Sequence, residues 1–156
     1  MLETIKLLNE LLADYQMFNM NLHGFHWNVE SDLFFEMHQK YKEIYDFTEE
    51  AIDSIAERIR GFGGFPLHCF KDYLEVAKVE CALFYRDPKQ INRNILETLN
   101  YLSAQQKKIM SYCLSQQDFV TFDVVQDLSE NTEKFSWMFR SFLSETSSEA
   151  FETEED

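Results

Sequence analysis

Residues 21–64, which read NLHGFHWNVESDLFFEMHQKYKEIYDFTEEAIDSIAERIRGFGG, decide the fold of this chain. They predict the end of one helix, a short break, and a second helix from about residue 33 to residue 60, with Ser31 and Asp32 offering an N-cap. The glycines from Gly61 onward are a typical C-terminal stop. One face of this helix is apolar and is expected to be buried, with Met37, Tyr41, Ile44, Ala51, Ile55 and Ile59.

A first helix is expected before this segment, over about residues 2–30. Its apolar positions alternate steps of three and four residues: Ile5, Leu8, Leu12, Tyr15, Phe18, Leu22 and Phe25. The short break makes the first two helices antiparallel. After the second helix, residues 67–87 predict a long crossover, in which FKDYLEVAKVE (residues 70–80) has room for one short helix.

A third helix is expected over about residues 88–115. Asp87 would cap it, and Pro88 would take the first helical position, where a missing N–H costs nothing. A fourth helix follows from Asp118 or Thr121 to about residue 144.

The 156 residues include only four Gly and two Pro, which favours long uninterrupted helices in one domain. Four long helices with one long connection between the second and the third resemble the ferritin-like bundle. The expectation is therefore an all-α, ferritin-like four-helix bundle over residues 1–144, with a short extra helix in the crossover. An acidic tail over residues 145–156 holds six acids and no base and is expected to be disordered.

The net charge of the chain indicates which partners it can bind. The formal net charge is −14, from 28 acidic and 14 basic residues, and the first 39 residues hold one basic side chain, Lys6. Such a surface repels polyphosphate backbones and attracts cations, so direct DNA binding is not expected.

Three cysteines, Cys69, Cys81 and Cys113, are an odd number without Cys-x-x-Cys spacing. They predict free thiols in a reducing cytosol rather than a disulfide framework or a zinc site. No apolar run approaches the roughly 18 residues that a membrane span needs. The N-terminal MLETIKLLNE does not have the features of a signal peptide, so we expect a cytoplasmic protein.

Two histidines and a carboxylate pair carry the chemistry. His26 and His38 are twelve residues apart, Asp53 follows fifteen residues after His38, and Glu57 lies one turn further. Imidazole and carboxylate together suit borderline metals such as Fe²⁺. Within one helix His38 and Asp53 would be about 22 Å apart, too far for one ion. A complete site would need the histidines of one subunit and the carboxylates of a two-fold-related subunit. A solvated polar helix face is the alternative interpretation of the same residues.

The runs NLHGFHWNV, LFFEMH and AIDSIAERIRGFGG resemble, at the family spacing, the Dps family of starvation-induced mini-ferritins, and the likeness covers nearly the whole chain. The resemblance implies Fe²⁺ as substrate, with His26 and His38 from one subunit and Asp53 and Glu57 from its two-fold mate as iron ligands and catalytic residues. It implies hydrogen peroxide as the preferred oxidant and storage of Fe³⁺ mineral in a hollow homo-dodecamer. Zinc would be a substitute for iron in the site. Trp27 would lie against the site, to quench radical by-products or to pack in the interface.

Lys42 departs from the family pattern, because many members carry an acid four positions after the second histidine. A protonated lysine does not ligate a cation and would weaken a second iron position. Alternatively, Lys42 pairs with Asp46 one turn further along the helix. No histidine has Glu three residues before it, which excludes the intrasubunit di-iron motif of larger ferritins. His23, one turn before His26, could share a metal with it, but a supporting or core position is the expectation.

Asp118, Asp123 and Asp127 surround the predicted start of the fourth helix. Acids at a helix N-terminus commonly act as caps or partners of the helix dipole. Similarly placed acids line an iron-entry pore in the family, which the resemblance implies here, most of all for Asp123 and Asp127.

Two other functions compete with iron oxidation and storage. A DNA-coating nucleoid protector would need basic termini, which this chain lacks. A cage weakened in catalysis by Lys42 would bind little iron.

Overall fold

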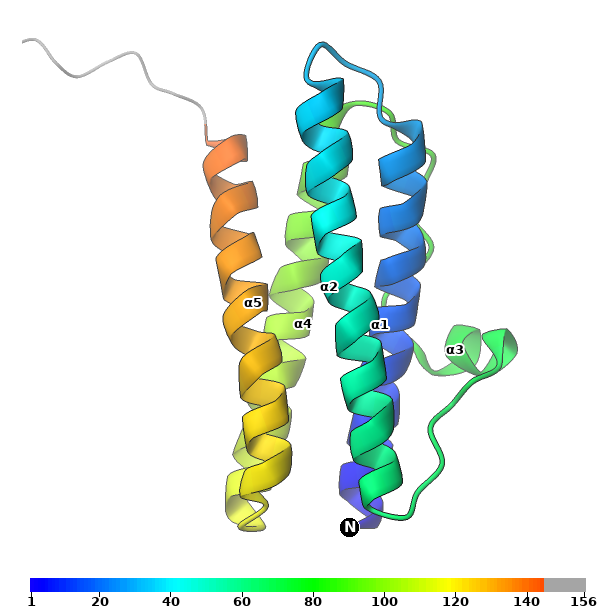
Figure 1. Ribbon diagram of the computed structural model, residues 1–156, viewed down its shortest axis with the longest axis vertical. Helices are drawn as coiled ribbons and strands as arrows, with labels where there is room; N and C mark the ends of the chain where they lie inside the picture. The colour runs from blue at the N-terminus through cyan, green and yellow to red at the C-terminus, as the bar shows by residue number, and fades with distance from the viewer. Residues whose placement is uncertain (145–156) are drawn as a thin grey trace, which may run out of the picture.

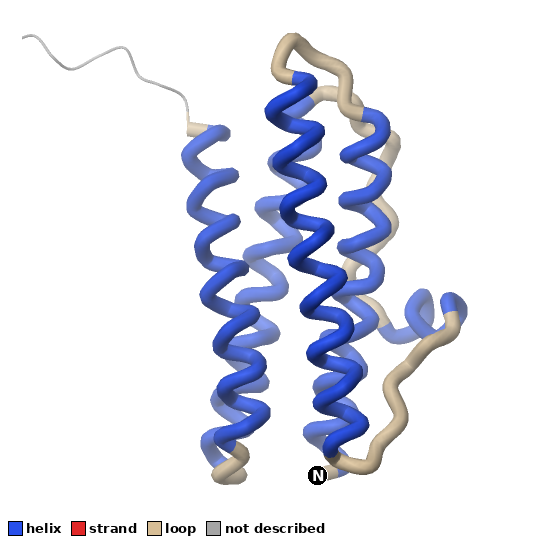
Figure 2. The backbone as a smooth tube through the Cα atoms, in the orientation of Figure 1, coloured by secondary structure: helices blue, strands red, loops and turns tan. Residues whose placement is uncertain are grey.

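The computed structural model describes residues 1–144, and every regular element in that range is a helix. The elements are α1 (Leu2–Asn28), α2 (Phe34–Gly61), α3 (Phe70–Val76), α4 (Pro88–Ser115) and α5 (Phe119–Leu143). The four long helices lie side by side as a bundle, whereas the short α3 stands on the crossover beside it (Figures 1 and 2). The predicted four-helix bundle with an extra helix in the crossover is confirmed. The predicted acidic tail, residues 145–156, lies outside the described range.

Capping chemistry sets the start of α4 where the sequence predicted it. The Asp87 carboxylate accepts a hydrogen bond from the Gln90 N–H at 3.1 Å, and Pro88 is the first residue of α4. The predicted cap of α2 is wrong. Its N-cap is Leu33, and the Ser31 hydroxyl accepts from the Leu33 N–H at 2.9 Å within a turn before the helix. The short α1–α2 loop needs that turn to reverse direction, which delays the helix start.

The core runs along the bundle axis. The apolar positions that the sequence predicted on α1 and α2 supply much of it. Among them, the fully buried side chains include Leu8, Phe18, Leu22, Ile44, Ile55 and Ile59. Burying each such side chain stabilises the fold by about 1.5–3 kcal/mol. In addition, α1 buries Leu7, Leu11 and Met17 on a second face, because the crossover and α3 cover it there.

Polar side chains of α1 hold the crossover against the bundle. Asp14 is only 2% exposed, and its Oδ1 accepts from the N–H groups of Lys78 and Val79 at 2.6 and 2.9 Å. Two turns later, Asn21 donates to the Glu80 carbonyl oxygen at 2.8 Å and accepts from the Ala82 N–H at 2.9 Å. These bonds satisfy the backbone of an extended segment that has no strand partner within the described range.

A polar network crosses the centre of the bundle. The Gln106 amide donates to the Tyr15 hydroxyl at 2.8 Å and to Thr132 Oγ1 at 2.9 Å, and all three residues are fully buried. Thr132 in turn donates to the Leu128 carbonyl oxygen at 2.8 Å. Burial raises the pKa of Tyr15 to about 12, against the opposing hydrogen bonds from Thr132 and Gln106. The network joins α1, α4 and α5 by contacts that need one particular packing.

All three cysteines are free thiols, as the sequence predicted: Cys113 is buried, Cys69 is partly buried and Cys81 is exposed. Within residues 1–144, no helix combines the length and the apolar character that crossing a membrane requires.

Candidate metal centre

His26 and His38 face each other where α1 ends and α2 begins. The two imidazole rings are stacked, with centroids 3.6 Å apart and planes inclined by 17°. The Nδ1 atom of His26 lies 2.6 Å from the His38 carbonyl oxygen, and the Nδ1 atom of His38 lies 2.7 Å from the His26 carbonyl oxygen. A carbonyl oxygen only accepts, so each Nδ1 carries the proton and donates. In the neutral form of each ring, Nε2 is then the nitrogen that is left free to bind a metal.

The surroundings keep His26 neutral. His26 is 8% exposed, and burial lowers the pKa of the ring below its ordinary value of 6.5. The hydrogen bond to His38 opposes this effect, whereas nearby His38, Lys42 and His23 lower the pKa further. A neutral His26 ring beside the His38 ring forms a nitrogen half-site for a cation.

Aromatic rings fix the histidines in place. His38 is stacked on its other side against Phe34, with centroids 4.9 Å apart. The Tyr45 ring meets His26 edge-on at 5.3 Å and stacks on His23 at 4.3 Å. His23 is therefore a neighbour of the pair through Tyr45. Trp27 is 66% exposed and meets the edge of His23 at 5.5 Å.

Lys42 pairs with Asp46, as one of the two interpretations of the sequence predicted. Its Nζ lies 2.9 and 2.8 Å from the two carboxylate oxygens of Asp46, one turn further along α2. The same ammonium lies 5.0 Å from the centroid of the Tyr45 ring. Asp46 thus offsets the positive charge of Lys42, although the charge still contributes to the lowered pKa of His26.

Asp53 and Glu57 lie toward the other end of the same helix. Both are exposed, and both belong to α2, which is continuous from Phe34 to Gly61. His38 and Asp53 are therefore about 22 Å apart along the axis, as the sequence predicted. Within residues 1–144, no three His, Cys, Asp or Glu residues of one chain converge as a metal site. One subunit brings the two histidines together but does not bring the carboxylates to them.

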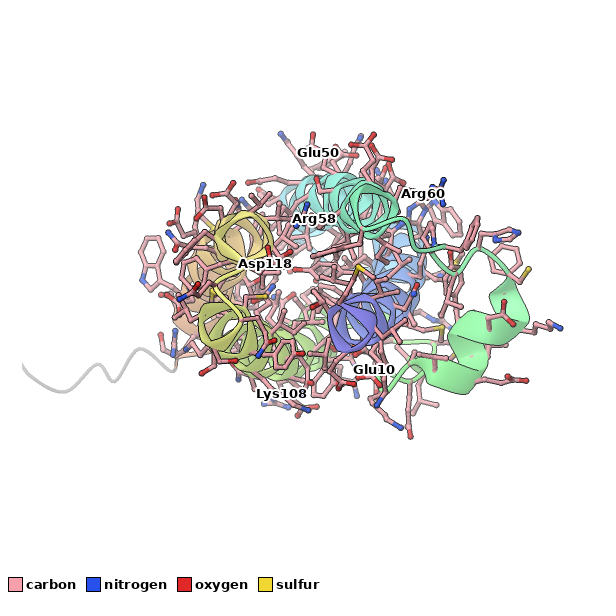
Figure 3. The ribbon with its side chains drawn as sticks, turned by 90° about the horizontal axis from the view of Figure 1, so that it is seen from below. Glu10, Glu50, Arg58, Arg60, Lys108 and Asp118 are labelled. Atoms are coloured by element: carbon pink, nitrogen blue, oxygen red, sulfur yellow. The ribbon has the colours of Figure 1, made fainter. Side chains whose placement is uncertain are left out.

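The three aspartates around the start of α5 differ from one another. Asp118 caps α5 by accepting from the Thr121 N–H at 3.1 Å, and it pairs with Arg58 of α2 at 3.2 Å. Figure 3, which looks along the bundle from the end opposite the α1–α2 loop, shows Arg58 and Asp118 next to each other. Burial raises the pKa of Asp118, but the bonds from Thr121 and the charge of Arg58 outweigh it and lower the pKa below 3.8. The capping interpretation of Asp118 is confirmed. Asp123 and Asp127 are exposed, and their role in a pore stays a prediction.

An apolar groove lies between the last turns of α1 and the crossover, with a volume of 360 Å³. Several of its large apolar side chains are exposed: Met20 (55%), Trp27 (66%), Leu83 (71%) and Phe84 (93%). A continuous exposed apolar surface of this kind is typical of an interface. The sequence analysis did not identify this groove, because its halves are about sixty residues apart.

Comparison with known proteins places this arrangement in a family. The model of the ferritin-like domain family named Ferritin matches residues 5–148. The chain is 32% identical to DNA protection during starvation protein 2 of Bacillus anthracis, over 92% of this chain and 98% of that protein. It is 34% identical to the DNA protection during starvation protein of Porphyromonas gingivalis, over 88% of this chain and 87% of that protein.

Solved structures agree with the sequence relatives. The Dps protein of Vibrio cholerae O1, described as a member of a broad superfamily of ferritin-like diiron-carboxylate proteins, superposes with a TM-score of 0.89 at 33% identity. The match covers 91% of this chain and 89% of that one. Dps from Staphylococcus aureus superposes with a TM-score of 0.90 at 28% identity, over 93% of this chain and 97% of that one.

Proposed function

This chain belongs to the Dps family of ferritin-like proteins, and from that membership and the geometry of the histidine pair we propose that it oxidises and stores iron. Fe²⁺ is the substrate. It binds between two subunits, is oxidised there with hydrogen peroxide, and is kept as Fe³⁺ mineral inside a hollow homo-dodecamer. The protein thereby removes both reactants that generate hydroxyl radicals.

The paired imidazoles carry the proposal. Reciprocal hydrogen bonds from Nδ1 leave the Nε2 atom of each neutral ring free, and the two rings stack nearly parallel. This is the arrangement that second-shell hydrogen bonds produce around a metal-binding histidine.

The carboxylate half of the site comes from a second subunit. A two-fold contact that places the far part of α2 of one subunit against the histidine pair of the other builds two identical sites at once. Asp53 and Glu57, one turn apart and exposed, then supply hard oxygen ligands that favour Fe³⁺ over Fe²⁺. The exposed apolar groove that contains Trp27, Leu83 and Phe84 supports the presence of a subunit interface on this chain.

The chemistry balances with iron and peroxide alone. Each Fe²⁺ gives up one electron, so two Fe²⁺ and two protons reduce one hydrogen peroxide to two waters. The negative charge of the chain attracts the cation, and interior carboxylates give Fe³⁺ hydroxide a surface on which to nucleate. Zinc, which accepts the same nitrogen and oxygen ligands, would compete for the site.

Anaerobic titration of the assembled protein with Fe²⁺, followed by one addition of hydrogen peroxide, tests the proposal. Ultraviolet absorbance should show rapid oxidation that saturates at about one or two irons per subunit, and His38→Ala should abolish it. Oxidation no faster than in buffer would contradict it.

A catalytically weakened cage is the second candidate, and Lys42 is the observation that favours it. Stopped-flow oxidation at the rate of buffer, in an intact shell, would support this candidate. The names of the relatives attribute DNA protection to those proteins. Direct DNA binding by this chain is disfavoured by its net charge of −14 and is tested by gel shifts at low salt, with and without Mg²⁺.

A further inference from the structure

His23 and Glu49 form a contact between α1 and α2 that the proposed function does not use. The Nε2 atom of His23 lies 3.4 Å from Oε1 of Glu49. Charge-assisted hydrogen bonds are shorter, at about 2.7–2.9 Å. The Nε2 atom is buried and has no hydrogen-bond partner among residues 1–144, although a carboxylate oxygen lies directly beside it. A simple His–Glu hydrogen bond therefore does not describe this pair.

We propose that His23 and Glu49 together bind a divalent cation, as a position within one subunit that is separate from the four interface ligands. Two donor atoms that hold one borderline metal ion at about 2.1 Å each, at a tetrahedral angle, lie about 3.4 Å apart. The observed separation of the nitrogen and the oxygen has this value. An ion held between them would take both atoms as ligands, and water would complete its coordination.

The neighbouring side chains prepare the pair for an ion. Stacking on Tyr45 at 4.3 Å and the edge contact with Trp27 at 5.5 Å hold the His23 ring in one orientation. The Glu49 side chain is 53% exposed, which leaves an aqueous path to the carboxylate. Lys42, two turns before Glu49 on α2, is paired with Asp46, which offsets its repulsion of a cation.

The position also lies next to the proposed iron site. Tyr45 contacts both His23 and His26, so a single ring separates the Glu49 pair from the His26–His38 pair. The ligand set, one imidazole and one carboxylate, suits Fe²⁺, Zn²⁺ or Co²⁺. The inference goes beyond the proposed function, because cation binding here requires neither a second subunit nor oxidation.

Equilibrium dialysis of the assembled protein with Co²⁺ tests this site without redox chemistry. Relative to the unmodified protein, Glu49→Gln and His23→Gln should each lower the bound Co²⁺ by about one ion per subunit. Glu50→Gln is the matched control. It removes the same charge from the adjacent residue, which lines the groove between α2 and α5 instead, and it should leave the stoichiometry unchanged.

The outcomes separate this site from the interface site. His38→Ala should remove the interface ion and leave the Glu49-dependent ion in place. If Glu49→Gln and His23→Gln both bind as much Co²⁺ as the unmodified protein, in shells of unchanged size by gel filtration, the His23–Glu49 site is overturned. If Glu49→Gln and His23→Gln lower the bound Co²⁺ but His38→Ala does not, the proposed interface site fails while this one stands.

Discussion

His26 and His38 each donate a hydrogen bond from Nδ1 to the backbone carbonyl oxygen of the other, at 2.6 and 2.7 Å. The pair therefore links the end of α1 to the start of α2 twice. It also decides which nitrogen of each ring is free. The nitrogen half of the proposed site is complete in one folded subunit, whereas its oxygen half is missing.

Hybrid shells test whether the site is shared. Subunits carrying His26→Ala and His38→Ala would be co-expressed with subunits carrying Asp53→Asn and Glu57→Gln. Each pure shell should be inactive in peroxide-dependent iron oxidation. Random mixing should restore roughly a quarter of the sites, because half of the two-fold pairs are hybrid and each has one intact site of two.

The control for that experiment is a shell that mixes His26→Ala subunits with Asp53→Asn, Glu57→Gln, His26→Ala subunits. It offers no intact combination and should remain inactive. If the first mixed shell is also inactive although both variants assemble together, the ligands do not come from two subunits.

Lys42→Glu should raise the number of Fe²⁺ ions bound per subunit. The substitution replaces the ammonium near His26 with a carboxylate, and it removes the partner of Asp46, so two acids become available to a second ion. Anaerobic calorimetric titration measures the stoichiometry. Lys40→Glu changes the charge of the same helix by the same amount, at a residue that pairs with Glu43, and should have little effect. Equal stoichiometry in both variants and the parent would refute the role of Lys42.

Asp118→Asn should lower stability at neutral pH by about 2 kcal/mol, because the partly buried Arg58 loses its partner. Because the pKa of Asp118 is lower in the folded chain than in the unfolded chain, the unfolded chain binds the proton more readily. The stability that Asp118 contributes is therefore present above pH 3.8 and is lost as the pH falls through the pKa of the folded state. Urea unfolding followed by circular dichroism between pH 3 and pH 6 should show a flatter pH dependence for the variant. Parallel curves would contradict the prediction.

Tyr15→Phe should destabilise the bundle by about 1–3 kcal/mol, since the Gln106 amide loses a buried acceptor. Burial raises the pKa of Tyr15 to about 12 from 10.0. Its share of the stability is thus present below pH 10.0 and lost as the pH rises through about 12, a dependence that the variant lacks. Chemical unfolding at neutral and alkaline pH measures both effects. Tyr112→Phe, at a partly buried ring at the far end of α4, should cost under about 0.5 kcal/mol.

The sequence predicted the helices well where local chemistry decides them. Asp87 and Pro88 mark the start of α4 because a cap and a missing N–H act within one turn. Ser31 and Asp32 failed as a cap because the loop that reverses the chain has its own geometry, which depends on how α1 and α2 pack.

The candidate site was predictable only in part. Composition and spacing single out the two histidines and the carboxylates, and helix rise separates them along α2. The reciprocal bonds between His26 and His38 depend on the approach of two backbones, and no residue pattern encodes that distance. The His23–Glu49 contact, between residues 26 positions apart, likewise follows from tertiary packing.

Because α2 is continuous, it fixes the distance and the angle between His38 and the carboxylates of Asp53 and Glu57. One residue inserted between His38 and Asp53 would turn the carboxylates by about 100° and advance them by about 1.5 Å relative to the histidines, and a helix has no slack to absorb this. The crossover has no such fixed register. Side chains of α1 hold its extended segment only from Lys78 to Ala82, and the residues beyond are irregular. Insertions and deletions are therefore tolerable in the irregular part of the crossover and forbidden within α2, where the helical register sets the spacing between the histidine half and the carboxylate half of the proposed site.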